Sequence, residues 1–213
     1  DAEAGYANNV ASTVNLAHAA ISAGVKRLIF LSSAAVYGRS YDIRPGGENQ
    51  SAAADWYARS KEAGEQALKD LSSELQVVVL RLPSVLGPGK KSPDVVTDML
   101  RQIDATGAAE VYGSGKSRRQ FADIDDACGL ILHCARRIND ERYSVIPAVG
   151  AQALPIARIA EEVVRAAGKG RVIFDRSRGE SPDQFIDPAI MRDKAGFDFK
   201  ISLEESIRKS IRG

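Results

Sequence analysis

The stretch that decides the fold is VKRLIFLSSAAVYG, residues 25–38. It opens with a nearly continuous apolar run, which is typical of a strand buried on both faces of a parallel sheet. Ser32 and Ser33 end that run. Ligand sites in open α/β sheets lie at the carboxyl ends of the strands, so a strand-end serine is a candidate site residue. A serine there can equally serve only as a helix or turn cap.

The segments on either side of this strand alternate between helical and extended patterns. Residues 7–23 carry apolar side chains at helical spacing, and Gly24 supplies a stop signal. Residues 39–54 are rich in Gly, Ser and Pro and predict a surface loop. Residues 55–73 predict a helix, and 76–87, QVVVLRLPSVLG, predict a second buried strand. This rhythm favours an α/β fold with a doubly wound parallel sheet.

The pattern changes after about residue 90, where strands become shorter. Helices are expected at 93–106, 124–138, 155–168, 187–196 and 202–211, and strands at 109–113, 119–124, 142–149 and 171–175. We therefore expect two domains. Residues 1–90 belong to the main sheet, and residues 91–213 form mostly a smaller α/β lobe, with segments that return to the sheet.

Composition narrows the class of protein. The 213 residues are 44% hydrophobic and 27% charged, which is typical of a soluble globular protein. A net charge of +1 without a basic stripe gives no footprint for nucleic acid, and no apolar run is long enough to span a membrane. Cys128 and Cys134 lie on one predicted helix, about 9 Å apart in rise, too far for a disulfide. We expect buried free thiols, no metal site and a cytoplasmic location.

The segment DWYARSKEAG, residues 55–64, contains a candidate proton-transfer pair. Tyr57 and Lys61 are four positions apart, which places them on one helix face with Cβ atoms roughly 5–6 Å apart. A phenol with a pKa of about 10 needs such a neighbouring ammonium to act as a base near neutrality. The spacing alone is common by chance on exposed helices. A strand-end serine, a loop and then this pair form a much rarer combination.

The segment GSGKS, residues 113–117, resembles the end of a phosphate-binding P-loop. The full motif needs glycine where Glu110 stands and a helix after the lysine, whereas an extended segment follows. A turn between strands is the favoured interpretation. No G-x-G-x-x-G occurs in the sequence, so it carries no dinucleotide-phosphate fingerprint of its own.

Taken in order, the motifs resemble those of the extended short-chain dehydrogenases/reductases, the NAD-dependent epimerase/dehydratase group. The matching segments are YANNVASTVNLAHAAISAGVKRLIFLSSAAVYG, YARSK, LRLPSVLGPG, VYGSGKSRRQFADIDDAC and RGESPDQFIDPAIMRDKAGFDFKISLEESI. The resemblance implies a Rossmann-like doubly wound sheet. Residues 1–90 would be the C-terminal part of its NAD-binding domain, and 91–213 its substrate lobe. The family's glycine-rich strand, turn and helix are expected to precede Asp1.

The resemblance also implies roles for single residues. Ser33, Tyr57 and Lys61 fall on the family's catalytic positions and also contact the cofactor. Asn8 and Pro83 fall on positions that line the nicotinamide half of the cofactor site.

The substrate positions follow in the same way. Ser33 and Ser84 fall on sugar-contacting positions, and Arg119 and Arg178 fall on the two arginines that hold a nucleotide-sugar diphosphate. A guanidinium suits that role because it makes paired hydrogen bonds to phosphate oxygens. Without the motif, each arginine would be read as part of a surface salt bridge. The family's dehydratases carry Asp and Glu where Ala34 and Ala35 stand, which disfavours water elimination.

The resemblance therefore implies an NAD-dependent nucleotide-sugar epimerase, with 4-epimerisation of a UDP-sugar through a transient keto intermediate as the expected reaction. NADP stays open as the cofactor, and a homodimer is expected. Two alternatives remain. One is an NAD(P)H-dependent keto-sugar reductase, and the other is a non-catalytic or truncated relative.

Overall fold

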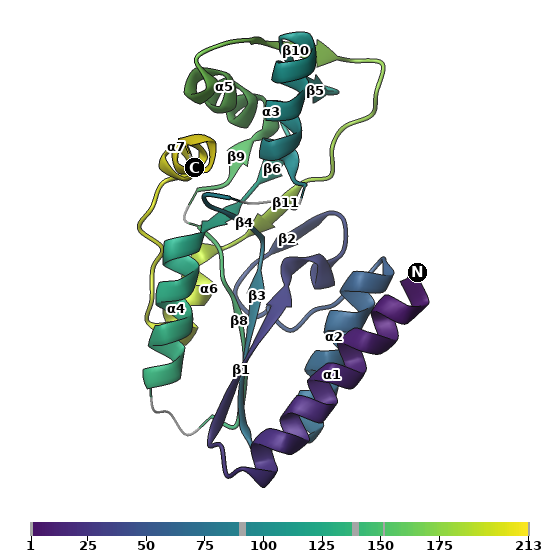
Figure 1. Cartoon of the computed structure of the whole chain (residues 1–213), viewed down its shortest axis with the longest axis vertical. Coiled ribbons are helices and arrows are strands. Elements are labelled where there is room, and N and C mark those ends of the chain that lie inside the picture. Colours follow the sequence, from purple (N-terminus) through teal and green to yellow (C-terminus); the bar gives the residue numbers. More distant parts are fainter. Residues whose placement is uncertain (1, 90–92, 138–140, 151, 213) are drawn as a thin grey trace.

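The computed structural model of the chain describes residues 2–89, 93–137, 141–150 and 152–212. Figure 1 shows an elongated molecule with the central sheet and its helices at one end and a smaller helical lobe at the other. The mixture of helices and mostly parallel strands confirms the expected α/β class.

The central sheet has three parallel strands in the order β1-β3-β8. They are β1 (Arg27–Ser33), β3 (Gln76–Leu82) and β8 (Tyr143–Pro147), and β1 forms one edge. The middle strand β3 is buried on both faces, as a continuous apolar run predicts. Its register places Ser33 opposite Leu82, so that β1 and β3 end together.

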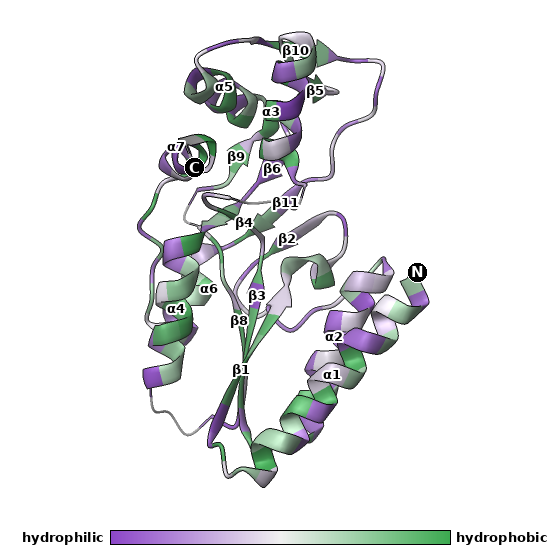
Figure 2. Cartoon of the chain, viewed as in Figure 1, coloured by the Kyte–Doolittle hydropathy of each residue, from purple (hydrophilic) through white to green (hydrophobic). Residues whose placement is uncertain are grey.

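Helices cover both faces of this sheet. Helices α1 (Ala2–Ser22) and α2 (Trp56–Asp70) pack together on one side, and α4 (Ile124–Arg136) lies on the other. Figure 2 shows hydrophobic and hydrophilic residues mixed along each of these helices, as expected for helices that bury one face. Among the residues described, no helix combines the length and the apolar character needed to cross a membrane.

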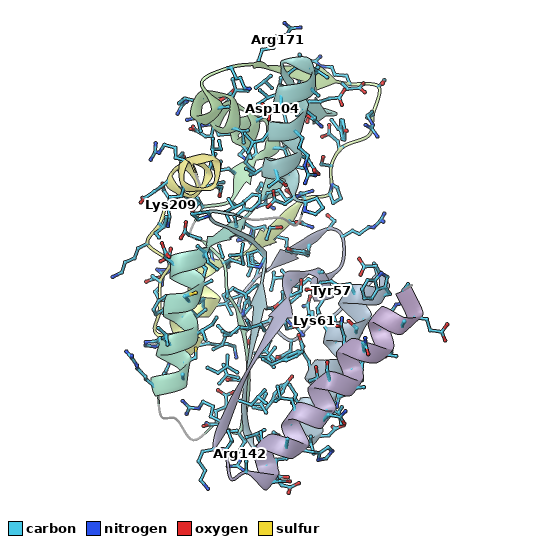
Figure 3. The ribbon with its side chains drawn as sticks, viewed as in Figure 1. Tyr57, Lys61, Asp104, Arg142, Arg171 and Lys209 are labelled. Atoms are coloured by element: carbon cyan, nitrogen blue, oxygen red, sulfur yellow. The ribbon has the colours of Figure 1, made fainter. Side chains whose placement is uncertain are left out.

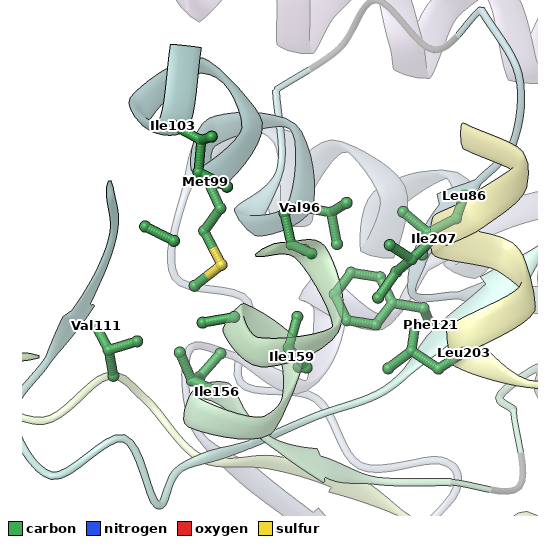
Figure 4. Close-up of a cluster of buried hydrophobic side chains, with 13 residues drawn as sticks. Leu86, Val96, Met99, Ile103, Val111, Phe121, Ile156, Ile159, Leu203 and Ile207 are labelled. Carbon is green, nitrogen blue, oxygen red and sulfur yellow. The ribbon is translucent and has the colours of Figure 1, made fainter. Parts of the chain in front are cut away.

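The smaller lobe has its own hydrophobic core, shown in Figure 4. Its helices are α3 (Val95–Thr106), α5 (Ile156–Ala167) and α7 (Leu203–Arg212). Helices α3 and α5 pack with a parallel strand pair, β5 (Ala108–Tyr112) and β10 (Arg171–Asp175), and α7 packs against α5. Two elements beyond residue 90 lie at the central sheet, because β8 pairs with β3 and α4 packs against β1.

The predicted strand 76–87 is two strands that pair with different partners. After β3, Pro83 interrupts the ladder, and β4 (Ser84–Leu86) pairs in parallel with β7 (Phe121–Asp123). Proline has no N–H to donate to a ladder, which explains the break. The change of direction carries residues 84–86 away from the sheet and towards the smaller lobe.

Four short strands form two pairings that fall outside the sequence-based expectations. Within the predicted loop 39–54, β2 (Tyr41–Ile43) pairs in parallel with β11 (Gln184–Ile186). In addition, β6 (Arg118–Arg119) pairs antiparallel with β9 (Leu154–Pro155). These strands are too short to show a periodicity, and each is stabilised by a segment far away in the sequence.

Two shorter helices complete the described part of the chain. The first is the 3-10 helix η1 (Ala34–Tyr37), and the second is α6 (Pro188–Ala195). The cysteines are both free, but only Cys134 is buried. The expectation of two buried thiols is wrong for Cys128, because it lies on the solvent-facing side of α4.

Candidate active site

Two adjoining pockets lie at the carboxyl ends of β1 and β3. The first, about 460 Å³, is lined by Ser33, Tyr57, Pro83 and Ser84 and by the segment that follows β4. The second, about 320 Å³, shares three of these residues with the first and extends to Arg119. The structure therefore brings most of the predicted site residues to one cleft, at the edge of the sheet where ligands bind in open α/β folds.

Ser33 has both of the roles that the sequence left open. It ends β1 and caps η1, because its Oγ accepts a hydrogen bond from the Ala35 backbone N–H at 3.1 Å. A hydroxyl that accepts in this way still has its own proton to donate. Ser33 can therefore cap the helix and donate a hydrogen bond to a ligand in either pocket.

The first turn of α2 positions Tyr57. Asp55 caps this helix, and its carboxylate accepts the Ala58 N–H at 2.8 Å. Tyr57 follows as the second helical residue, with 40% of its surface exposed in the first pocket. The cap fixes where the helix begins and hence where the phenol stands.

Lys61 lies one turn further along α2 (Figure 3). Its Nζ is 5.8 Å from the centre of the Tyr57 ring and donates a hydrogen bond to the carbonyl oxygen of Leu31 at 2.9 Å. The ammonium thus bridges α2 and β1 beneath the tyrosine. Burial lowers the pKa of Lys61, against the opposing charge of Glu65.

Two consecutive arginines differ in their surroundings. Arg118 makes salt bridges with Asp183 at 2.6 Å and with Asp42 at 3.1 Å. Arg119 makes no salt bridge within the described residues, although the charge of Asp183 acts on it, and its Nη1 donates to the carbonyl oxygens of Arg118 and Pro182. Burial lowers the pKa of Arg119, yet arginine stays charged in proteins. Arg119 is therefore a half-buried cation available to an anion in the second pocket.

Arg178 and Asn8 lie outside both pockets. The Arg178 guanidinium is 4.0 Å from the centre of the Tyr112 ring, on an exposed segment of the smaller lobe. Asn8 is exposed on α1, whereas its neighbour Asn9 donates from Nδ2 to the Ser60 hydroxyl on α2 at 2.9 Å. The structure does not bring these two predicted residues to the cleft.

Several lining residues come from segments in which the sequence predicted neither a helix nor a strand. Tyr41 on β2 and Gln184 on β11 face the second pocket together with Arg39. Burial raises the pKa of Tyr41 to about 12, so its phenol stays protonated and can donate a hydrogen bond. Only the pairing of β2 with β11 brings these residues together, and the alternation in three residues is too short to reveal it.

The GSGKS segment is a turn, as predicted. It joins β5 to β6, and no helix follows it. Glu180 occupies the turn, where its Oε1 accepts the Ser114 N–H at 2.7 Å. A carboxylate of the protein itself thus takes the hydrogen bond that a phosphate would need.

The carboxylates that line the second pocket are both helix caps. Asp55 accepts the Ala58 N–H, and Asp94 accepts the Thr97 N–H, each at 2.8 Å. Ala34 and Ala35 also line this pocket, directly after the candidate catalytic serine. No free carboxylate therefore stands next to Ser33 among the described residues.

The fold is that of an α/β protein of the Rossmann class, with a parallel sheet covered by helices on both faces. A serine ends one of its strands, and a tyrosine–lysine pair lies on the neighbouring helix. The model of the NAD dependent epimerase/dehydratase family matches residues 1–146. The chain belongs to this family.

The individual relatives share limited sequence identity with the chain. UDP-glucose 4-epimerase of Vibrio cholerae is 35% identical over 131 residues, which is 59% of this chain and 39% of that protein. Putative GDP-L-fucose synthase 2 of Oryza sativa subsp. japonica is 25% identical over 96% of this chain and 63% of its own length. The chain therefore matches less than two thirds of the length of either protein.

The solved structures support the same fold. The Bordetella bronchiseptica enzyme WbmG, in complex with NAD and UDP, superposes with a TM-score of 0.83 at 24% identity. The match covers 100% of this chain and 66% of that one.

Proposed function

We propose that the protein is an NAD-dependent nucleotide-sugar epimerase that inverts C4 of a UDP-sugar. The observation that carries the proposal is the placement of Ser33 and Tyr57 in one pocket, with the Lys61 ammonium behind the tyrosine. The family of the chain and its similarity to a UDP-glucose 4-epimerase support a reaction of this kind.

The first pocket fits the nicotinamide half of NAD. At about 460 Å³ it has room for a nicotinamide and its ribose, and its wall includes Tyr57 and Pro83. The Ser33 hydroxyl on its lining can donate a hydrogen bond, whereas the Lys61 ammonium lies behind Tyr57 and not on the lining. When bound, NAD would supply an acceptor that takes a hydride from the sugar and later returns it.

Proton transfer is the task of the protein's own residues. Tyr57 would remove the proton from the sugar hydroxyl as that carbon is oxidised, and would return it when the carbon is reduced. Lys61 would stabilise the phenolate during the interval, because opposite charges at this range favour the ionised form. The Ser33 hydroxyl would hold the reacting oxygen in line by donating a hydrogen bond.

Arg119 would bind the diphosphate of the substrate. Its guanidinium is half buried in the wall of the second pocket and makes no salt bridge in the described residues. Arginine forms paired, charge-assisted hydrogen bonds with phosphate oxygens. Arg178 would join it only if the exposed segment that carries it moved towards the pocket.

Epimerisation is favoured over dehydration because no free carboxylic acid stands beside Ser33 among the described lining residues. Elimination of water needs an acid to protonate the leaving hydroxyl. The residues after Ser33 are alanines, and the two pocket carboxylates are engaged as helix caps. The described lining therefore offers proton transfer at Tyr57 without a second acid beside it.

The protein incubated with NAD and UDP-galactose tests the proposal. Accumulation of UDP-glucose, followed by NMR and without consumption of added NADH, is the expected result. Stoichiometric consumption of NADPH or NADH with a UDP-keto-sugar would instead establish the reductase. Absence of both reactions, with the fold intact by circular dichroism, would leave the non-catalytic relative.

We also propose that two copies associate through α1 and α2. Trp56 and Tyr6 line a groove between these helices, and 43% and 38% of their surfaces are exposed to solvent. Large aromatic side chains exposed side by side are typical of an interface.

A further inference from the structure

A buried ion pair lies directly beneath the candidate active site. Glu65 stands one turn beyond Lys61 on α2, and Arg81 lies on β3. Their side chains are only 6% and 4% exposed. Arg81 Nη2 is 2.6 Å from Glu65 Oε2, and its Nε is 3.0 Å from Oε1, a bidentate geometry. Neither residue lines either of the two pockets.

The pair is the centre of a larger network. The Ser32 hydroxyl donates a second hydrogen bond to Glu65 Oε1. Arg81 Nη1 donates to the carbonyl oxygens of Glu48 at 2.9 Å and Gln50 at 2.8 Å. Both carboxylate oxygens are therefore satisfied, and the network joins β1, α2, β3 and residues 48–50. Fully satisfied buried networks of this kind hold one arrangement of their elements.

Stability alone does not explain such a pair. Burial of two charges carries a large desolvation cost, and apolar replacements of similar size are often neutral or stabilising. Burial by itself would lower the pKa of Arg81, but the hydrogen bonds and charge of Glu65 outweigh it and raise that pKa. The Arg81 guanidinium thus stays charged, and what its bidentate contact with Glu65 provides is fixed geometry.

What the network fixes is the position of α2 along β1. Tyr57, Lys61 and Glu65 follow one another every four residues, so they lie along one face of α2. Lys61 binds the carbonyl oxygen of Leu31, and Glu65 binds the hydroxyl of Ser32. Successive turns of the helix are therefore bound to successive residues of the strand. Two bonds at different heights prevent the helix from sliding or rotating.

Close packing reinforces this register. A Cβ added at Gly64, which precedes Glu65 on α2, would lie 3.0 Å from the Phe30 ring on β1. A side chain at this position would require the Phe30 ring to shift by a few tenths of an ångström, so glycine suits the close approach of the helix to the strand. The next residue of β1 after the bound Ser32 is Ser33, which faces the pocket.

We propose that Glu65 and Arg81 are positioning residues that set where Tyr57 stands relative to the strand-end serine. The inference rests on the proposed function, because it assigns the network a role in the same reaction. A displacement of about 1 Å at reacting groups can lower a rate about 100-fold. A network that holds α2 and β1 in register can therefore control kcat without touching the substrate.

A double variant, Glu65→Leu with Arg81→Met, tests this directly. Both charges are removed together, so no unpaired charge is left in the core and the fold is expected to persist. We expect kcat to fall about 100-fold while KM changes less than about threefold, because the pocket walls remain in place.

Ser32→Ala is a milder variant that leaves the ion pair intact. It removes one hydrogen bond between β1 and α2, and we expect about a tenfold fall in kcat. Glu162→Gln is the matched control. Glu162 is a buried glutamate on α5, paired with Arg158 at 2.8 Å and Arg165 at 2.8 Å, in the lobe away from Tyr57. This control is expected to keep the kcat of the wild type.

A readout independent of activity separates this inference from the proposed function. The 13C ring resonance of Tyr57, assigned by its loss in Tyr57→Phe, is expected to shift in Ser32→Ala and in the double variant but not in Glu162→Gln. Unchanged kcat and resonance in a folded double variant would overturn the positioning role. If the wild type turns over no UDP-sugar, the proposed function fails, and the resonance alone decides whether the network positions Tyr57.

Discussion

The Lys61 ammonium donates a hydrogen bond to the carbonyl oxygen of Leu31 at 2.9 Å. Leu31 belongs to β1, the edge strand of the sheet, and Lys61 to the helix that presents Tyr57. The same side chain therefore anchors the helix to the sheet and places a positive charge beside the phenol.

Lys61→Met is expected to abolish most turnover without unfolding the protein. General acid–base devices contribute about 10²–10⁴-fold to rate, and loss of the supporting charge should lower kcat in that range. Steady-state kinetics with a UDP-sugar and NAD would measure it. A variant with kcat within about twofold of the wild type would show that the ammonium has no part in proton transfer.

The same variant carries a prediction about stability and pH. Burial lowers the pKa of Lys61, so the folded state binds its proton less tightly than the unfolded chain does. This group destabilises the fold at neutral pH, and the penalty is relieved as pH rises from the folded pKa towards about 10.4. We expect Lys61→Met to have a Tm at pH 7 equal to or above that of the wild type, with a smaller advantage at pH 10.

How much of the site can be predicted from the sequence depends on how far apart in the chain the contacting residues lie. The strand that ends at Ser33 could be predicted from its apolar run. The pair Tyr57 and Lys61 stood out through its place after that serine and through the resemblance to the family, because its spacing alone is common. The contact of Tyr41 with the chain near Gln184 depends on a strand pairing across more than a hundred residues, which no local pattern records.

Other features were beyond sequence reasoning for a different reason. The hydrogen bonds between Arg81 and Glu65 join a predicted strand to a predicted helix. Their pairing becomes visible only when the helix lies on the sheet. The break at Pro83 could have been anticipated, since a proline rarely continues a central strand, but not the new partner of the strand that follows.

Arg119 and Arg118 offer a comparison of neighbouring residues. Arg119→Met should raise the KM for a nucleotide-sugar about 10–100-fold and weaken UDP binding, because charged hydrogen bonds to phosphate are lost while folding is unaffected. Isothermal titration with UDP would measure it.

Arg118→Met serves as the control for that experiment. It removes the salt bridges to Asp183 and Asp42 and is expected to lower thermal stability instead. Equal affinity for UDP in wild type and Arg119→Met would remove this residue from the substrate site.

Asp123 links α4 to α7, and we expect this link to be sensitive to acid. Its buried carboxylate caps α4 and accepts hydrogen bonds from Ser206 at 2.8 Å and Lys209 at 2.9 Å (Figure 3 labels Lys209). Burial would raise the pKa of Asp123, but these partners outweigh it and lower that pKa. Its stabilisation is therefore present above about pH 4 and is lost as pH falls through the folded pKa.

Asp123→Asn should accordingly cost about 1–3 kcal/mol of unfolding free energy at pH 7, with a smaller difference at pH 2.5. Urea titrations at the two pH values would measure both quantities. An equal loss at both would show that the charge of Asp123 is unimportant.

A substitution at Trp56 tests the proposed association of two copies. Trp56→Glu would place a charge in the groove between α1 and α2, where it would be costly to bury. Sedimentation velocity should show a dimer for the wild type and a monomer for the variant. Leu132→Glu is a matched control, because Leu132 is 53% exposed on α4, on the other side of the sheet. A monomeric wild type would contradict the proposal.

The central claim is that Tyr57 transfers a proton in the epimerisation of a UDP-sugar, and Tyr57→Phe tests it most directly. The Tyr57 hydroxyl makes no hydrogen bond within the described residues, so the variant should keep the Tm of the wild type. Rates measured with NAD and UDP-galactose should fall at least about 100-fold. A folded Tyr57→Phe protein that interconverts the sugars at the wild-type rate would contradict the account.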